Sequence, residues 1–294
     1  MTQNPMSLGQ PQTSSHPKHI AIVGKHQVTA LTRVESTSTF PDDVLVKRVD
    51  YDGQSSLVDA LRGKDVLIIT LAVNAPQDQE AKLIEAAAEA NVAWVIPNEW
   101  GLDSDDRSLA EDSILGELKQ KTRRHIESLG KSSWVSLVCG FWYEFSLAGG
   151  AERFGFDFPN QQCGRAIAQV LSLDIHAAGD KKDGPTLSQF KNRPVYVSSF
   201  LVSQRDMFES VLRVSGAVEA NWNVKYEDVK QRYDEGRAEM EGGDMTDLVK
   251  LLYARDFLFG GGGNYEALRG LHNGVLSLPR EDLDDRTRVT IENM

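Results

Sequence analysis

Two short β-prone runs near the start of the chain constrain its fold most, because almost nothing connects them. The first run is Ile20–Val23, closed by Gly24, and the second begins at Val28 and ends in Thr32 and Arg33. Only three residues separate Gly24 from Val28. A parallel crossover needs about a dozen residues or more, usually including a helix. The two runs therefore form a tight hairpin, continue as one strand, or lose one partner.

Beyond this point, strand and helix patterns alternate. Strands are expected over Val44–Asp50, Asp65–Leu71, Val92–Pro97 and Ser133–Val138, and helices over 55–62, 77–91 and 111–129. The Asp65–Leu71 run is apolar on both faces, which is typical of a central parallel strand that helices cover on each side. The alternation predicts an α/β fold, a doubly wound parallel sheet that lacks the usual first helix.

After Phe141 the pattern changes to aromatic and glycine-rich connections. Later elements are a helix over 163–173, a strand over Pro194–Ser198, a helix capped by Ser203, a short strand with alternating Trp222, Val224 and Tyr226, and a helix over 227–240. We divide the chain into a disordered tail (1–17), a dinucleotide-type sheet domain (18–140) and a smaller substrate lobe (141–294) that is partly interleaved with the sheet domain.

The amino-acid composition limits the classes of partner that the chain is expected to bind. The 32 basic and 43 acidic residues give a net charge of −11, which disfavours nonspecific binding to nucleic acid or to an anionic membrane. A small molecule is the expected partner, and a protein partner is left open. Two cysteines and no basic-then-apolar leader favour a reducing, cytoplasmic location. No His and Cys spacing indicates a metal site, and no apolar run reaches the roughly 20 residues that span a bilayer.

Several motifs, in this order, resemble those of NmrA-like and isoflavone-reductase-like proteins, which are atypical short-chain dehydrogenases, and of their fungal members in particular. They are Ile-Ala-Ile-Val-Gly (20–24), Thr-Ala-Leu-Thr-Arg (29–33), Trp-Val-Ile-Pro-Asn-Glu-Trp-Gly (94–101), Lys-Gln-Lys-Thr-Arg-Arg (119–124), Gly-Phe-Trp-Tyr-Glu-Phe-Ser-Leu (140–147) and Arg-Gly-Leu-His-Asn (269–273). The resemblance implies a Rossmann-like fold and an NADP-dependent oxidoreductase acting on a small, aromatic or conjugated substrate.

The resemblance also assigns roles to individual residues. Lys119, four residues before Arg123, matches the lysine that acts in catalysis in the family; the residues alone leave a solvated helix lysine as the alternative. Arg33 and Thr32 match the end of the strand that meets the 2′-phosphate of NADP, although a strand-end arginine in solvent is the competing interpretation. Gly24 would belong to the cofactor-binding turn.

Further candidates lie where strands end. Asn98 is expected near the cofactor and Glu99 near the substrate, although both residue types also serve simply in turns and caps. Tyr143 and His272 are candidate substrate-pocket residues, or else core residues. The glycines at 260–263, followed by Asn264, suggest a phosphate cradle, but we interpret them as a loop into an Asn-capped helix.

The sequence departs from the family pattern at two places, and this changes what we expect of the cofactor-binding site. The glycine-rich turn and phosphate-binding helix expected after Gly24 are absent, and Phe158 nearly adjoins Cys163 where fungal relatives carry a longer connection. Both look like internal deletions, of the kind that a shortened gene model or splice form produces. We therefore expect NADP(H) binding to be weakened or lost. The alternatives to an enzyme are a non-catalytic NAD(P)-sensing or regulatory protein and an inactive truncated form.

Overall fold

The structure is a computed structural model that describes residues 26–72, 75–76, 78–113, 115–148, 161–176, 184–241, 248–258 and 262–292. The first β-prone run and Gly24 lie outside the described residues. How that run pairs therefore stays a prediction.

All strands among the described residues pair in parallel. Strand β1 (Thr29–Arg33) pairs with β2 (Leu45–Val49) in a two-stranded sheet. A second sheet has the order β3-β4-β6-β5, with β7 also paired to β6; its strands are β3 (Val66–Ile68), β4 (Trp94–Ile96), β5 (Trp100–Gly101), β6 (Ser133–Val138) and β7 (Arg193–Tyr196). The predicted α/β fold with parallel strands is confirmed.

Successive residues in the strands of the second sheet place their apolar side chains on opposite faces of the sheet. Val95 and Trp134 pack in one cluster with α1 (Gln54–Leu61), α2 (Gln79–Glu89) and α4 (Leu115–Leu129). Trp94 and Val135, next to them in sequence, pack in another cluster with α6 (Gln161–Leu171) and the short 3-10 helix η1 (Leu187–Phe190). Successive strand residues point to opposite faces, so this division is what a sheet covered on both sides requires.

The two sheets share the first of these clusters. Leu31 of β1 packs against a group that includes Val49 of β2 and Leu67 of β3. Between residues 26 and 53 the structure contains turns and strands but no helix, as the sequence predicts. The first helix, α1, ends where Gly63 adopts φ 69°, a left-handed conformation that favours glycine after a helix.

Where a single helix was expected over 111–129, the chain forms two. Helix α3 (Arg107–Asp112) begins at Asp106, whose side chain accepts a hydrogen bond from the Leu109 amide, and α4 follows as a separate element. Residues 141–294 also contribute to the sheet layer, because β7 pairs with β6 and α6 packs on one face. The boundary at residue 140 stays a prediction.

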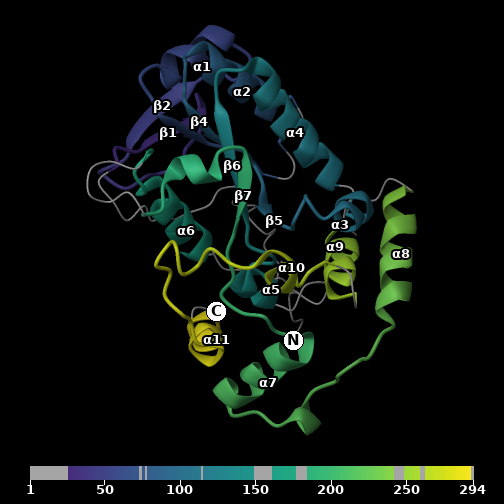
Figure 1. Cartoon of the computed structure of the whole chain (residues 1–294). Helices are drawn as coiled ribbons and strands as arrows, with labels where there is room; N and C mark the ends of the chain where they lie inside the picture. The colour runs from purple at the N-terminus through teal and green to yellow at the C-terminus, as the bar shows by residue number, and fades with distance from the viewer. Residues whose placement is uncertain are drawn as a thin grey trace, which may run out of the picture.

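The remaining helices gather at the end of the molecule away from α1 and α2, with α8 along one side (Figure 1). They are α5 (Tyr143–Ala148), α7 (Gln204–Ser215), α8 (Val229–Glu241), α9 (Leu248–Phe257), α10 (Tyr265–Arg269) and α11 (Leu283–Glu292). Each helix among the described residues is too short or too polar to span a bilayer.

The prediction of a short strand around Trp222 is wrong. Trp222, Val224 and Tyr226 lie in a connection without regular structure between α7 and α8, and Tyr226 is 83% exposed. An alternating pattern becomes a strand only when a neighbouring strand supplies backbone partners, and no described strand lies beside this segment.

Candidate functional site

Asn98 links two strand ends at the carboxyl edge of the larger sheet. Its side-chain Oδ1 accepts a hydrogen bond from the Leu71 amide (3.2 Å), and its Nδ2 donates one to the Leu71 carbonyl (3.1 Å). Its own amide donates to Oε1 of Glu80 on α2 (2.8 Å). The side-chain amide of Asn98 thus holds the ends of β3 and β4 together.

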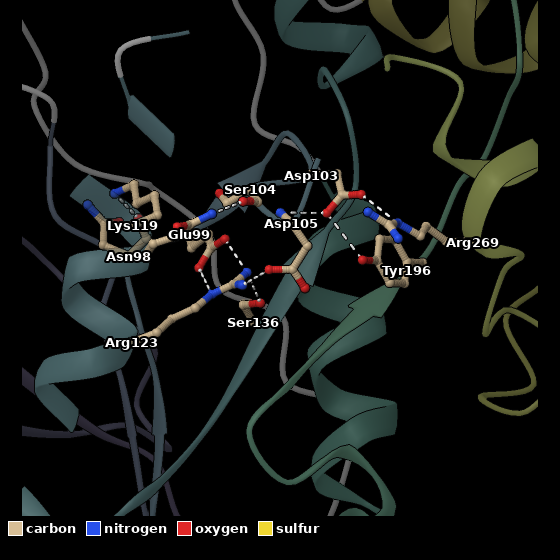
Figure 2. Close-up of polar contacts among 11 residues, drawn as sticks. Asn98, Glu99, Asp103, Ser104, Asp105, Lys119, Arg123, Ser136, Tyr196 and Arg269 are labelled. Atoms are coloured by element: carbon tan, nitrogen blue, oxygen red, sulfur yellow. Dashed lines mark hydrogen bonds and ion pairs between the residues drawn. The ribbon is translucent and has the colours of Figure 1, made fainter. Parts of the chain in front are cut away.

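Lys119 reaches the same edge from α4. Its Nζ donates a hydrogen bond to the Asn98 carbonyl oxygen at 2.5 Å, and its side chain is half-buried (Figure 2). Lys119, to which the resemblance assigns a catalytic role, therefore lies beside Asn98, and that role stays a prediction. An ammonium group has three donors, so this one bond leaves donors for a ligand at the edge.

Glu99 and Arg123 form a buried ion pair. Arg123 Nε lies 2.9 Å from Glu99 Oε2, and Nη2 lies 2.5 Å from Oε1, while both side chains are about 95% buried. The guanidinium also bonds Asp105 (2.5 Å) and Ser136 (2.9 Å), and it stacks 4.4 Å above the Trp134 ring. Both Glu99 oxygens are therefore occupied, and the structure gives Glu99 a positioning role rather than a free surface toward a substrate.

The polar network continues toward β7 and α10. Asp103, which is buried, accepts hydrogen bonds from the Tyr196 hydroxyl (3.1 Å) and from Arg269 Nε (3.0 Å). The Asp105 amide also donates to Asp103 (3.0 Å), which joins this group to the Arg123 cluster (Figure 2). Burial and the nearby Asp103 carboxylate raise the pKa of Tyr196. The network fixes the loop between β4 and α3 at the carboxyl edge.

Arg33 stands at the carboxyl end of β1 and is exposed, while Thr32 beside it is half-buried. No carboxylate of the described residues forms an ion pair with Arg33. An unpaired guanidinium beside a hydroxyl is suited to a phosphate group, so this corner fits the 2′-phosphate end of NADP.

The pyrophosphate end fits less well. A dinucleotide's pyrophosphate normally rests on backbone amides at the N-terminus of a helix that follows the first strand. Residues 26–53 supply no helix, and Gly24 lies outside the described residues. The described part of the chain therefore offers an unpaired guanidinium at Arg33 and, over residues 26–53, no helix N-terminus for a pyrophosphate.

A cavity of about 140 Å³ lies at the carboxyl ends of β6 and β7. Much of its wall is aromatic or apolar: Phe141, Tyr143, Phe200, Met207, Tyr253, Phe257 and Tyr265. Phe141 and Tyr253 stack with ring centroids 4.0 Å apart. Open α/β sheets keep their ligands beyond the carboxyl ends of their strands, so this cavity is the candidate substrate site.

Most polar groups in the cavity wall are already engaged within the protein. The Tyr265 hydroxyl donates to the Val197 carbonyl (2.7 Å), and the Tyr253 hydroxyl pairs with Ser146 Oγ (2.5 Å). Asn273 uses both side-chain atoms on the backbone of Ser198, at 3.1 and 2.7 Å. These groups shape the cavity and leave little hydrogen-bonding capacity for a ligand.

Two carboxyl groups are the exceptions. Asp256 of α9 lines the cavity without a hydrogen bond to its carboxylate from any described residue, and burial raises its pKa to about 7. Glu281 lies with Oε1 3.8 Å from Arg165 Nη1, while its Oε2 is buried with no partner among the described residues. Burial raises the pKa of Glu281 as well.

The two predicted substrate-pocket residues differ in position. Tyr143 lines the cavity, but its hydroxyl is bonded to Thr287 Oγ1 at 2.5 Å and burial raises its pKa. His272 is absent from the described cavity wall; its Nδ1 accepts a hydrogen bond from the Tyr196 amide (3.0 Å), and burial lowers its pKa. His272 therefore acts as a core residue that holds β7, and it does not enter our proposal.

The glycine run before α10 has a packing role in the part that is described. A Cβ at Gly263 would lie 2.4 Å from the backbone oxygen of Asp256, which is too close for a side chain. Asn264 caps α10 by accepting a hydrogen bond from the Ala267 amide (3.2 Å). The interpretation as a loop into an Asn-capped helix is confirmed, and Gly260 and Gly261 lie outside the described residues.

Sequence reasoning missed four groups in the cavity wall: Asp256, Glu281, Cys139 and Cys163. The two sulfur atoms lie 3.3 Å apart, although the cysteines are 24 residues apart in sequence. Cys139 directly follows β6, but Asp256, Glu281 and Cys163 do not stand at a strand end that could have identified them. Their proximity arises only when α6, α9 and the segment before α11 pack around the ends of β6 and β7.

Comparison with known proteins shows which proteins the chain resembles. Residues 14–148 match the NmrA-like family. The chain is 27% identical over 270 residues to the oxidoreductase aprR of Aspergillus flavus, covering 88% of each chain. It is also 41% identical over 106 residues to the isoflavone reductase homolog IRL of Zea mays, a match that covers 35% of this chain and 33% of that protein.

Solved structures share the fold. An isoflavone reductase superposes with a TM-score of 0.63 at 17% identity, covering 91% of each chain. The protein AtPrR2, solved with NADP+ and (+)pinoresinol, gives a TM-score of 0.59 at 15% identity over 90% of this chain and 91% of that one. At these identities the structures establish the fold alone. Residues 14–148, a little less than half of the chain, are therefore similar to the NmrA-like family, and the chain shares the fold of isoflavone-reductase-like proteins.

Proposed function

We propose that this protein is an NADP(H)-dependent oxidoreductase that acts on a small aromatic or conjugated molecule. The observation that carries the proposal is the position of Lys119, whose Nζ lies at the carboxyl edge beside Asn98. The oxidoreductase relative and the NADP+-bound neighbour support the same class of reaction. When bound, the nicotinamide would supply or accept the hydride.

In this proposal, Arg33 and Thr32 hold the 2′-phosphate. Arg33 is exposed and unpaired among the described residues, so phosphate binding costs it no internal ion pair. Lys119 holds the ribose end of the cofactor or moves a proton, and Asn98 positions Lys119 through its carbonyl oxygen. Because the pyrophosphate lacks its usual helix, we expect the cofactor to bind weakly.

The cavity beyond β6 and β7 would take the substrate. Its aromatic walls support a flat, conjugated ligand, and a volume of about 140 Å³ suits a molecule the size of a single ring. Tyr143 contributes its ring to this wall, while Glu99 acts indirectly by fixing Arg123.

The test compares the two nicotinamide cofactors. We expect the chain to bind NADPH more tightly than NADH, and Arg33→Ala to weaken NADPH binding by about tenfold while leaving NADH binding unchanged. Arg62→Ala, which removes the exposed arginine at the C-cap of α1, is the matched control. Equal binding of both cofactors that Arg33→Ala does not alter would refute the assignment, and binding without turnover on any aromatic substrate would indicate a sensing role.

A further inference from the structure

Two carboxyl groups among the described residues that line the cavity keep oxygens without a hydrogen bond. The hydroxyls of Tyr143, Tyr253 and Tyr265 all have internal partners. Asp256 has no hydrogen bond to its carboxylate among the described residues, and Glu281 Oε2 has none either. A ligand that carries hydrogen-bond donors would satisfy these carboxyl oxygens.

The cavity also lacks a cationic lining. No lysine, arginine or histidine side chain is among the described residues that line it. Arg286 bonds Glu144 at 2.6 Å and thereby neutralises that carboxylate from behind the wall. Arg255, next to Asp256 on α9, points its guanidinium to Asp112, 2.8 Å away. Asp256 lies within the electrostatic influence of Arg255 but forms no ion pair with any described residue.

The walls suit a cation as well as a ring. Phe141, Tyr253 and Phe257 surround the space near Asp256, and aromatic faces attract positive charge. Charge on a ligand would be balanced by a carboxylate in a partly dry site, where the attraction between opposite charges is stronger than in water.

We propose that this cavity binds a small aromatic ligand that carries a positively charged nitrogen, as an ammonium or iminium group, with the Asp256 carboxylate as its counterion. The inference rests on the proposed function only in taking the cavity as the substrate site. It narrows the expected substrate from aromatic molecules in general to aromatic amines and iminium ions.

The test uses three ring compounds of nearly equal size: benzylammonium, benzyl alcohol and benzoate. Each is titrated calorimetrically into the full chain at about pH 8, where the ammonium group and Asp256 are both charged. We expect benzylammonium to bind about tenfold more tightly than benzyl alcohol and benzoate to bind least. Asp256→Asn should abolish the preference for the cation.

The matched control is Glu266→Gln. Glu266 also lines the cavity, but it is exposed, so its loss should change benzylammonium affinity by less than about twofold. If Asp256→Asn and Glu266→Gln weaken binding equally, the attraction comes from general surface charge and the counterion assignment is wrong. Equal affinity for benzylammonium and benzyl alcohol in the unmodified chain would also overturn the proposal.

A pH titration of the unmodified chain provides a second measurement that does not depend on a variant folding. Arg255 on the same helix and Tyr265 from α10 interact electrostatically with Asp256. Glu144, Glu266 and Glu281 line the same cavity. The pKa of Asp256 lies near neutrality. The preference for benzylammonium should therefore fall as the pH is lowered from about 8 to about 6, and a constant preference would contradict the proposal.

None of these titrations contains a nicotinamide cofactor. Cation binding without any NADPH binding would remove the proposed reaction and leave this inference standing. NADPH binding without a preference for the cation would remove this inference and leave the proposed reaction standing.

Discussion

Replacing Asp256 by asparagine should stabilise the protein at alkaline pH. Burial raises the pKa of this carboxyl from 3.8 to about 7, so the folded chain binds a proton that the unfolded chain has already released. Between about pH 4 and pH 7 the folded state holds more protons, and the free energy of unfolding therefore falls as pH rises through this window. Above about pH 7 the full cost of the buried charge is present.

The magnitude follows from the size of the shift. About three pKa units correspond to about 4 kcal/mol, at about 1.36 kcal/mol per unit. Because the cavity admits water to the carboxylate, we expect Asp256→Asn to gain about 2 to 4 kcal/mol over the unmodified chain at about pH 8, and almost nothing at about pH 4.

Urea denaturation at several pH values measures this difference directly. The difference between the variant and the unmodified chain isolates Asp256, because the other groups that titrate in this window are the same in both proteins. Glu266→Gln, an exposed carboxylate at the same cavity, should show no such pH dependence. The reasoning is refuted if Asp256→Asn is no more stable than the unmodified chain at about pH 8.

Two further predictions concern α4. Lys119→Met should lower NADPH-dependent turnover by about tenfold or more while changing the free energy of unfolding by less than about 1 kcal/mol. Lys121→Met, an exposed control on the same helix, should leave turnover unchanged. Equal turnover in the two variants would rule out a catalytic role for Lys119. Glu99→Gln should destabilise the fold by about 3 kcal/mol in urea denaturation, because it leaves the buried Arg123 poorly compensated. The exposed Glu117→Gln should change little, and a similar small effect at Glu99 would contradict the argument.

The sequence predicts the elements whose signals are local. Residues 133–138 form a strand as expected, because a run of apolar and β-branched residues suits a central position in a sheet. Gly63 ends α1 because its left-handed backbone conformation is strained in other residues. Trp222 and its alternating neighbours show the limit of local signals, since a strand also needs a partner strand that sequence pattern alone does not reveal.

Some parts of the candidate site could likewise be predicted from local sequence signals, and others could not. Lys119 could be selected by its spacing from Arg123 in a family motif and Asn98 by its place at a strand end, and the structure brings the two together. The cavity could not be predicted in this way, because Asp256 and Glu281 come from segments that meet only through tertiary packing. Glu99 was expected near a substrate, but its oxygens are bound by Arg123, a partner 24 positions later that no local rule would select.

Calorimetric titration of NADPH tests the central claim, that the chain is an NADP(H) oxidoreductase whose cofactor site is weakened. The unmodified chain is compared with a version in which a glycine-rich turn and helix are inserted between Gly24 and Val28. If two or three phosphate-directed donors are missing, each worth about 1.5 to 3 kcal/mol, the dissociation constant should be about millimolar in the unmodified chain and about micromolar in the restored one. Micromolar binding by the unmodified chain, or no gain on restoration, would contradict the account.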